Sequence, residues 1–180
     1  MLLLRPIFVL SALAFLSGLA AAQDKTHPFA KAKVGEWVGY NVETGSPSAN
    51  ITIKQTVSAR DAEGVTLKVQ MSMGGKPLEA TDQRVSLKEP FDPARMLQSP
   101  TVKSQITKLG EGEETLTVAG KKYKCTWVKN RVITEFNGQI IETNSKMWIS
   151  KDVPLGGLVR AETETAGAMT VMELTGVGSR

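Results

Sequence analysis

Apolar and polar residues alternate along most of the chain after residue 50, in short runs that are broken by Gly, Asn and Asp. This two-residue period is typical of strands that bury one face, because successive side chains of a strand point to opposite sides of the sheet. Helical periodicity is scarce. We therefore expect a mainly β fold: a single antiparallel, up-and-down curved sheet, a half-barrel or barrel of about eight to ten strands with one or two short helices.

Turn-forming residues set the expected ends of the strands. Asp92-Pro93 favours one short helix over residues 94–97. Beyond Pro100 the pattern leaves strand and loop open, and alternation resumes at Leu116. The strands are expected at residues 51–57, 65–73, 85–87, 116–118, 123–127, 132–136, 140–141, 157–165 and 169–177.

Asn137-Gly138 is the strongest local signal, because both residues tolerate the positive φ of a tight hairpin turn. If these are the two loop residues, Phe136 faces Gln139. The residue numbers of every further pair then add up to 275, which places Trp127 opposite Trp148. The aliphatic side of this hairpin would then carry Val128, Val132, Phe136, Ile141, Met147 and Ile149. The other side would carry Cys125, Trp127 and Trp148, followed toward the turn by Lys129, Arg131, Asn144 and Lys146.

A hairpin that is apolar on both sides at its base must be covered on both sides, or it leaves a hydrophobic patch for a ligand. The tryptophans could pack beneath the N-terminal segment or a loop, or they could line a binding surface. A bulge between residues 128 and 134 would exchange the two faces.

Residues 1–22 have the features of a secretory signal peptide: Arg5, an apolar run over residues 7–16, and small residues at 20–22. Residues 23–180 would then form a single β-rich domain, periplasmic or secreted, with no stable membrane anchor after cleavage. Cleavage removes only one charged residue, so the formal net charge falls from +4 to +3. Such a small excess does not indicate a nucleic-acid partner.

Cys125 is the only cysteine, so no intramolecular disulfide is possible. It could be a small buried apolar residue, an intermolecular disulfide partner or a reactive thiol. The single histidine, His27, lies close to the expected cleavage point, which leaves little for a catalytic triad or a zinc site. Gly74-Gly75-Lys76 lacks the flanking residues of a P-loop. Paired carboxylates remain possible by number, but we expect no enzyme, cofactor or metal site.

Two regions together resemble a group of uncharacterised exported bacterial proteins. They are Val34-Gly35-Glu36-Trp37-Val38-Gly39-Tyr40, and Gly120-Lys121-Lys122-Tyr123 followed by Trp148-Ile149-Ser150-Lys151-Asp152-Val153-Pro154. Such proteins are similar in strand order to the LolA and LolB lipoprotein carriers, in which a curved antiparallel sheet surrounds a hydrophobic cavity. The resemblance implies a half-barrel, although this chain lacks clear amphipathic helices to fill the cavity.

These observations predict a non-enzymatic exported binding protein for a lipid-like or otherwise hydrophobic small molecule. The expected ligand-binding residues are Trp37, Tyr123, Trp127 and Trp148. The alternative is a cell-envelope structural or protein-interaction domain without a small-molecule ligand, whose partner would be another envelope protein.

Overall fold

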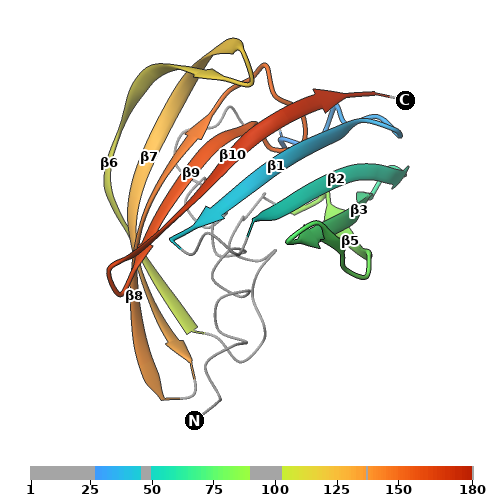
Figure 1. The fold of residues 1–180 in the computed structure, drawn as a ribbon. Coiled ribbons are helices and arrows are strands. Elements are labelled where there is room, and N and C mark those ends of the chain that lie inside the picture. Colours follow the sequence, from blue (N-terminus) through green and yellow to red (C-terminus); the bar gives the residue numbers. More distant parts are fainter. Residues whose placement is uncertain (1–26, 46–49, 90–102, 137, 180) are drawn as a thin grey trace.

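The computed structural model describes residues 27–45, 50–89, 103–136 and 138–179, and these form one open, curved antiparallel sheet (Figure 1). No helix occurs in these ranges. The expected signal peptide and the helix expected at 94–97 lie outside the described residues. The strands are β1 (Trp37–Thr44), β2 (Ile51–Arg60), β3 (Gly64–Met73), β4 (Lys76–Pro77), β5 (Thr81–Ser86), β6 (Lys103–Val118), β7 (Lys121–Phe136), β8 (Gln139–Ile149), β9 (Leu158–Thr165) and β10 (Ala168–Gly178).

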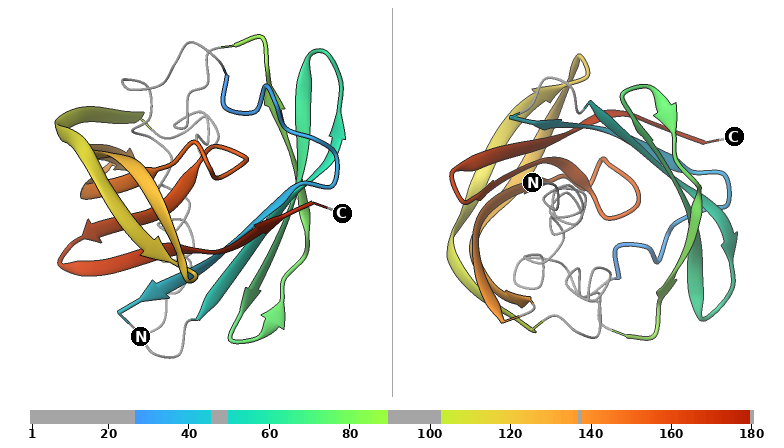
Figure 2. Two further views of the ribbon diagram at one scale, coloured as in Figure 1. Left: turned by 90° about the horizontal axis from the view of Figure 1, so that it is seen from above. Right: turned by 60° about the horizontal axis from the view of Figure 1, so that its bottom comes forward.

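The strand order is β4-β3-β2-β1-β10-β9-β8-β7-β6, and β5 also pairs with β3. Most neighbours in space are therefore neighbours in sequence, as an up-and-down sheet requires. The exceptions are β1 with β10, which joins the two ends of the described chain, and β3 with β5. Figure 2 shows the strands arranged around a rounded outline, with β6 and β7 on one side and β2, β3 and β5 on the other.

The β7–β8 hairpin has the register that the Asn-Gly turn predicts. Phe136 pairs with Gln139, and Trp127 pairs with Trp148. The register continues without a shift to the pair Thr126 and Ile149, so no bulge exchanges the faces of this hairpin. Two other two-residue turns place an alanine at positive φ, Ala119 at 49° and Ala166 at 51°.

Strand β6 is much longer than the sequence predicted. It begins at Lys103 and pairs with β7 along its length, with one register shift between Lys108 and Gly110, whereas the alternating pattern marked only residues 116–118. Residues 104–109 are exposed throughout. Because neither face of that segment is buried, its sequence carries no alternation to reveal the strand.

We call the face of the sheet that carries most of the apolar core the aliphatic face, although Tyr123, Cys125 and Trp148 of the opposite face also belong to the core. In the β7–β10 region this face carries Val128, Met147, Ala161 and Met172, all buried. The opposite face of the same strands, which carries Trp127 and Trp148, is here called the tryptophan face. The core continues on β1 to β3 through Val38, Tyr40, Val42, Ile51, Ile53, Val57, Val65 and Leu67.

Two irregular segments complete the core. Residues 27–36 contribute the buried Phe29 and Ala32. The guanidinium group of Arg60 on β2 holds this segment by donating to the carbonyl oxygens of Ala30 and Ala32. The loop 150–157 contributes buried Val153 and Leu155.

Candidate functional site

The two tryptophans of the β7–β8 hairpin project from the same side of the sheet. Trp127 and Trp148 are direct cross-strand partners, and directly opposed residues of an antiparallel pair share a face. Their neighbours Val128 and Met147 point to the aliphatic face. The structure therefore confirms the geometric arrangement that the sequence predicted.

Polar and cationic side chains surround the Trp148 indole. Its Nε1 donates a hydrogen bond of 2.8 Å to Oε2 of Glu114 on β6. The ammonium group of Lys146 lies 4.3 Å from the centroid of the Trp148 ring and 4.6 Å from that of Trp127. The guanidinium of Arg160 lies 5.9 Å from the Trp148 ring on its β9 side. Trp148 is only 5% exposed, so these contacts occupy the ring.

The hydrogen bond from Trp148 lowers the pKa of the Glu114 carboxyl below its usual value, and the positive charges of Lys146 and Arg160 act in the same direction. Lys146 also forms an ion pair of 3.6 Å with Glu114. Glu114 is consequently held ionised while it accepts from the indole. The sequence analysis placed Lys146 on this side of the hairpin but did not pair it with Glu114 of β6.

Trp127 packs against two glycines of β6. A Cβ atom on Gly112 would lie 2.9 Å from the Trp127 ring, and one on Gly110 would lie 3.6 Å from it. Trp37 repeats the arrangement on β1, since Cβ atoms on Gly178 and Gly176 would lie 2.7 and 3.4 Å from its ring. Packing of an aromatic ring over glycine compensates for the missing side chain in a strand. These contacts give both tryptophans a structural role.

The four residues expected to bind a ligand do not form one site. Trp127, Trp148 and Tyr123 share the tryptophan face of neighbouring strands, whereas Trp37 lies on β1, separated from β8 by β10 and β9. Tyr123 is 3% exposed, with the Lys121 ammonium 5.0 Å from its ring centroid. Ligand binding by these residues stays a prediction.

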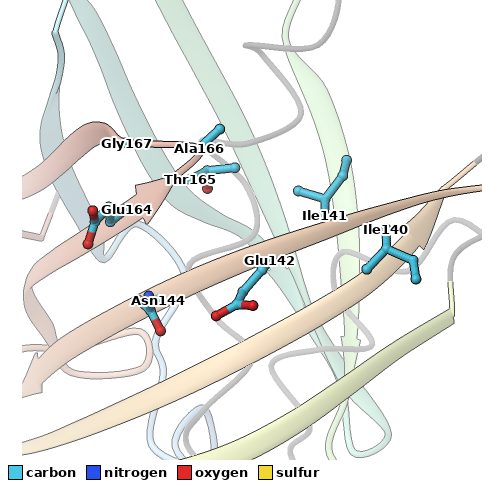
Figure 3. Close-up of a pocket in the computed structure, with 8 residues that line it drawn as sticks. All are labelled: Ile140, Ile141, Glu142, Asn144, Glu164, Thr165, Ala166 and Gly167. Carbon is cyan, nitrogen blue, oxygen red and sulfur yellow. The ribbon is translucent and has the colours of Figure 1, made fainter.

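Among the hollows formed by the described residues, two shallow ones are not lined by Trp127, Trp148 or Tyr123. One, of about 370 Å³, lies beside Trp37 over β1 to β3. The other, of about 380 Å³, lies between the start of β8 and the β9–β10 turn (Figure 3). Its lining residues are Ile140, Ile141, Glu142, Asn144, Glu164, Thr165, Ala166 and Gly167.

The aliphatic face contains a polar feature that the sequence analysis missed. Asn130, Ser145 and Thr163 pair in one row across β7, β8 and β9 and are 2%, 7% and 5% exposed. The Nδ2 atom of Asn130 and the Oγ1 atom of Thr163 are buried without a hydrogen-bond partner. The predicted register already put Asn130 opposite Ser145, but the strand partner of Ser145 on β9 could not be read from the turn.

The titratable groups of His27 and Cys125 each contact the nearby backbone. Within the described ranges, no group of three or more His, Cys, Asp and Glu side chains is placed to hold a metal ion. Nδ1 of His27 accepts a hydrogen bond of 3.2 Å from the Phe29 backbone, and burial lowers the pKa of this histidine. Cys125 is buried, with its Sγ 3.5 Å from the Tyr123 carbonyl oxygen, and burial raises the pKa of its thiol.

Among the residues that the structure describes, no helix has the length and apolar character needed to cross a membrane. No known family model matches the chain, and no curated protein matches it in sequence.

The chain is similar to solved structures of bacterial proteins. A predicted exported protein with a YmcC-like fold from Bacteroides fragilis is 12% identical with a TM-score of 0.53, and the match covers 92% of this chain and all of that one. A predicted lipoprotein from Parabacteroides distasonis is 13% identical with a TM-score of 0.56, over 87% of this chain and all of that one. The hypothetical lipoprotein YmcC from Escherichia coli is 10% identical with a TM-score of 0.40, over 100% and 99% of the chains. At these identities the first two likenesses concern the fold, a curved β-sheet found in proteins described as exported or as lipoproteins.

Proposed function

We propose that this chain is an exported, non-catalytic protein that binds a lipid-like molecule against the aliphatic face of its curved sheet. The observation that supports this most directly is the open sheet itself. Among the described residues, β6 at one end does not pair with β4 or β5 at the other, so a single sheet curves around an apolar face without closing. The exported proteins that the sequence resembles are similar in strand order to the carriers LolA and LolB, in which an incomplete barrel surrounds a hydrophobic cavity.

The composition of the aliphatic face also suits an apolar guest. Val128, Met147, Ala161 and Met172 form an uninterrupted apolar row across β7 to β10. Met71 and Met73 lie partly buried on β3 beside the core. Methionine side chains adapt to irregular apolar shapes, which favours a binding surface that accepts chains of different lengths. Periplasmic or secreted localisation belongs to the same proposal, because a cleaved N-terminal signal peptide would place the domain where lipids of the envelope are available.

The test is to purify the exported chain from its envelope, to identify extracted lipids by mass spectrometry, and to titrate the delipidated protein with a pyrene-labelled fatty acid. We expect a bound lipid and saturable binding. Val132→Gln, on the aliphatic face of β7, should weaken binding severalfold. Ile140→Gln, an exposed position on the tryptophan face of the same hairpin, should leave it unchanged. Absence of lipid together with non-saturable titration would refute the proposal.

A specific observation also favours the second candidate function, pairing with an envelope protein. Strand β6 lies at the end of the sheet, and residues 104–109 are exposed, including Ile106 at 41% and Leu109 at 51%. An exposed strand edge with apolar side chains is a template for pairing with another strand. On this model Leu109→Lys abolishes co-purification of a stoichiometric partner without altering stability, whereas lipid binding is unaffected.

A further inference from the structure

The row formed by Asn130, Ser145 and Thr163 is an unusual element of the aliphatic face. The three residues are direct partners across β7, β8 and β9, so their side chains lie side by side on one face. All three are more than nine-tenths buried. The row is therefore a buried polar strip that borders the apolar row of Val128, Met147 and Ala161.

Neither neighbouring row has, among the described residues, a buried polar side-chain atom without a hydrogen-bond partner. On one side lies the apolar row of Val128, Met147 and Ala161. On the other side, Thr143 and Thr165 hydrogen-bond to each other through their hydroxyl groups at 2.9 Å. The polar strip differs because the Asn130 amide nitrogen and the Thr163 hydroxyl have no hydrogen-bond partner.

Buried polar atoms without partners are rare in folded proteins, because each loses its hydrogen bonds to water and receives none in return. Two such atoms in one row make the strip a candidate site for a polar group from outside the chain. An amide nitrogen donates, and a hydroxyl both donates and accepts. The complementary group is one that accepts hydrogen bonds at the surface of an apolar molecule.

The charge around the strip narrows the chemistry of that group. Lys108, the β6 partner of Asn130, forms an ion pair with Glu111 at 2.5 Å. Lys146, Glu162 and Glu164 are adjacent in sequence to residues of the strip, so their side chains point to the opposite, tryptophan face. Lys108 is the cation beside the strip and its charge is already paired with Glu111, so a buried carboxylate or phosphate would find no unpaired countercharge there, and burying an uncompensated charge is costly.

We propose that Asn130, Ser145 and Thr163 bind the uncharged carbonyl of an acyl ester or amide, while the neighbouring aliphatic rows contact its hydrocarbon chain. This inference rests on the proposed lipid-binding function and specifies the class of ligand. It makes the strip the element that distinguishes an acyl ester from a plain hydrocarbon.

The test compares two neutral probes on the delipidated full chain: the methyl ester of a pyrene-labelled fatty acid and the pyrene-labelled alkane of equal chain length. We expect the ester to bind about tenfold more tightly, as one or two net hydrogen bonds imply. The double variant Asn130→Leu/Thr163→Val, which replaces the polar groups by apolar ones of similar shape, should bind both probes equally. Thr143→Val, in the satisfied row, should keep the preference for the ester.

A second measurement does not depend on binding. Because the variant removes unpartnered polar atoms, its ligand-free melting temperature should rise by about 2–4 °C. A fall in melting temperature would show that ordered water already satisfies the strip, and would overturn the inference.

The outcomes separate the two proposals. Equal binding of both probes by the wild-type protein overturns the role of the strip and leaves lipid binding intact. Failure of both probes to bind overturns lipid binding as well.

Discussion

The indole ring of Trp127 on β7 lies across the backbone of Gly112, its direct partner on β6. A Cβ atom at position 112 would come within 2.9 Å of three ring atoms, Cε2, Cζ2 and Nε1, well inside the normal separation of non-bonded heavy atoms. The ring leaves room only for glycine there. Gly112 does not have a positive φ, so glycine is required at this position by packing and not by backbone conformation.

Gly112→Ala should therefore lower the free energy of unfolding by about 1–3 kcal/mol, the usual cost of overpacking. Chemical denaturation followed by circular dichroism measures this. Gly45→Ala is the matched control, because nothing lies within 4 Å of a Cβ there, and it should change stability by less than about 0.5 kcal/mol. In a Trp127→Leu background the cost of Gly112→Ala should shrink. An equal cost in both backgrounds would contradict the contact.

The hydrogen bond between Trp148 and Glu114 predicts a pH dependence of stability. The pKa of Glu114 is lower in the folded state than its usual value of 4.5. The ionised carboxylate therefore stabilises the fold above about pH 4.5, and this contribution is lost as the pH falls through the lower folded-state pKa. Glu114→Gln should lose less stability than the wild type between about pH 6 and about pH 3. Parallel curves for the two proteins would show that Glu114 does not contribute.

Cys125 should behave as a buried apolar residue. It is 3% exposed, and burial raises the pKa of its thiol, so little thiolate is available for reaction. We expect maleimide labelling of the native protein to be slower by orders of magnitude than labelling in guanidinium chloride, and no disulfide-linked dimer on a non-reducing gel. Rapid native labelling would favour the reactive-thiol alternative.

The alanines at positive φ in the β6–β7 and β9–β10 turns are candidates for stabilisation. Ala119 and Ala166 adopt the left-handed conformation, which is unfavourable for residues with a Cβ and is best tolerated by Gly, Asn and Asp. Ala119→Asn and Ala166→Asn should each raise the free energy of unfolding by about 0.5–1 kcal/mol. Ala80→Asn, outside the turns, is the control. A loss of stability at both turn positions would contradict the turn geometry.

Much of the β-sheet was predictable from local patterns, although β6 shows where they fail. A strand is visible in sequence when one face is buried and the other is not. Ile51, Ile53 and Val57 meet that condition on β2, where the intervening Thr52 is exposed. Residues 104–109 do not, because they are exposed on both faces at the edge of the sheet. The pairing of β1 with β10 could not be predicted from the sequence either, because no local turn connects these two strands.

The sequence by itself determined that Trp127 and Trp148 oppose each other, because a two-residue turn fixes the register of the strands that it connects and side chains alternate with a strict period. Only the tertiary structure decided what meets those rings: Gly112 and Glu114 of β6, and Arg160 of β9. It likewise aligned Thr163 with Ser145 and so completed the buried polar strip. These contacts depend on strand pairs whose register no single turn sets, and on a bulge between β8 and β9.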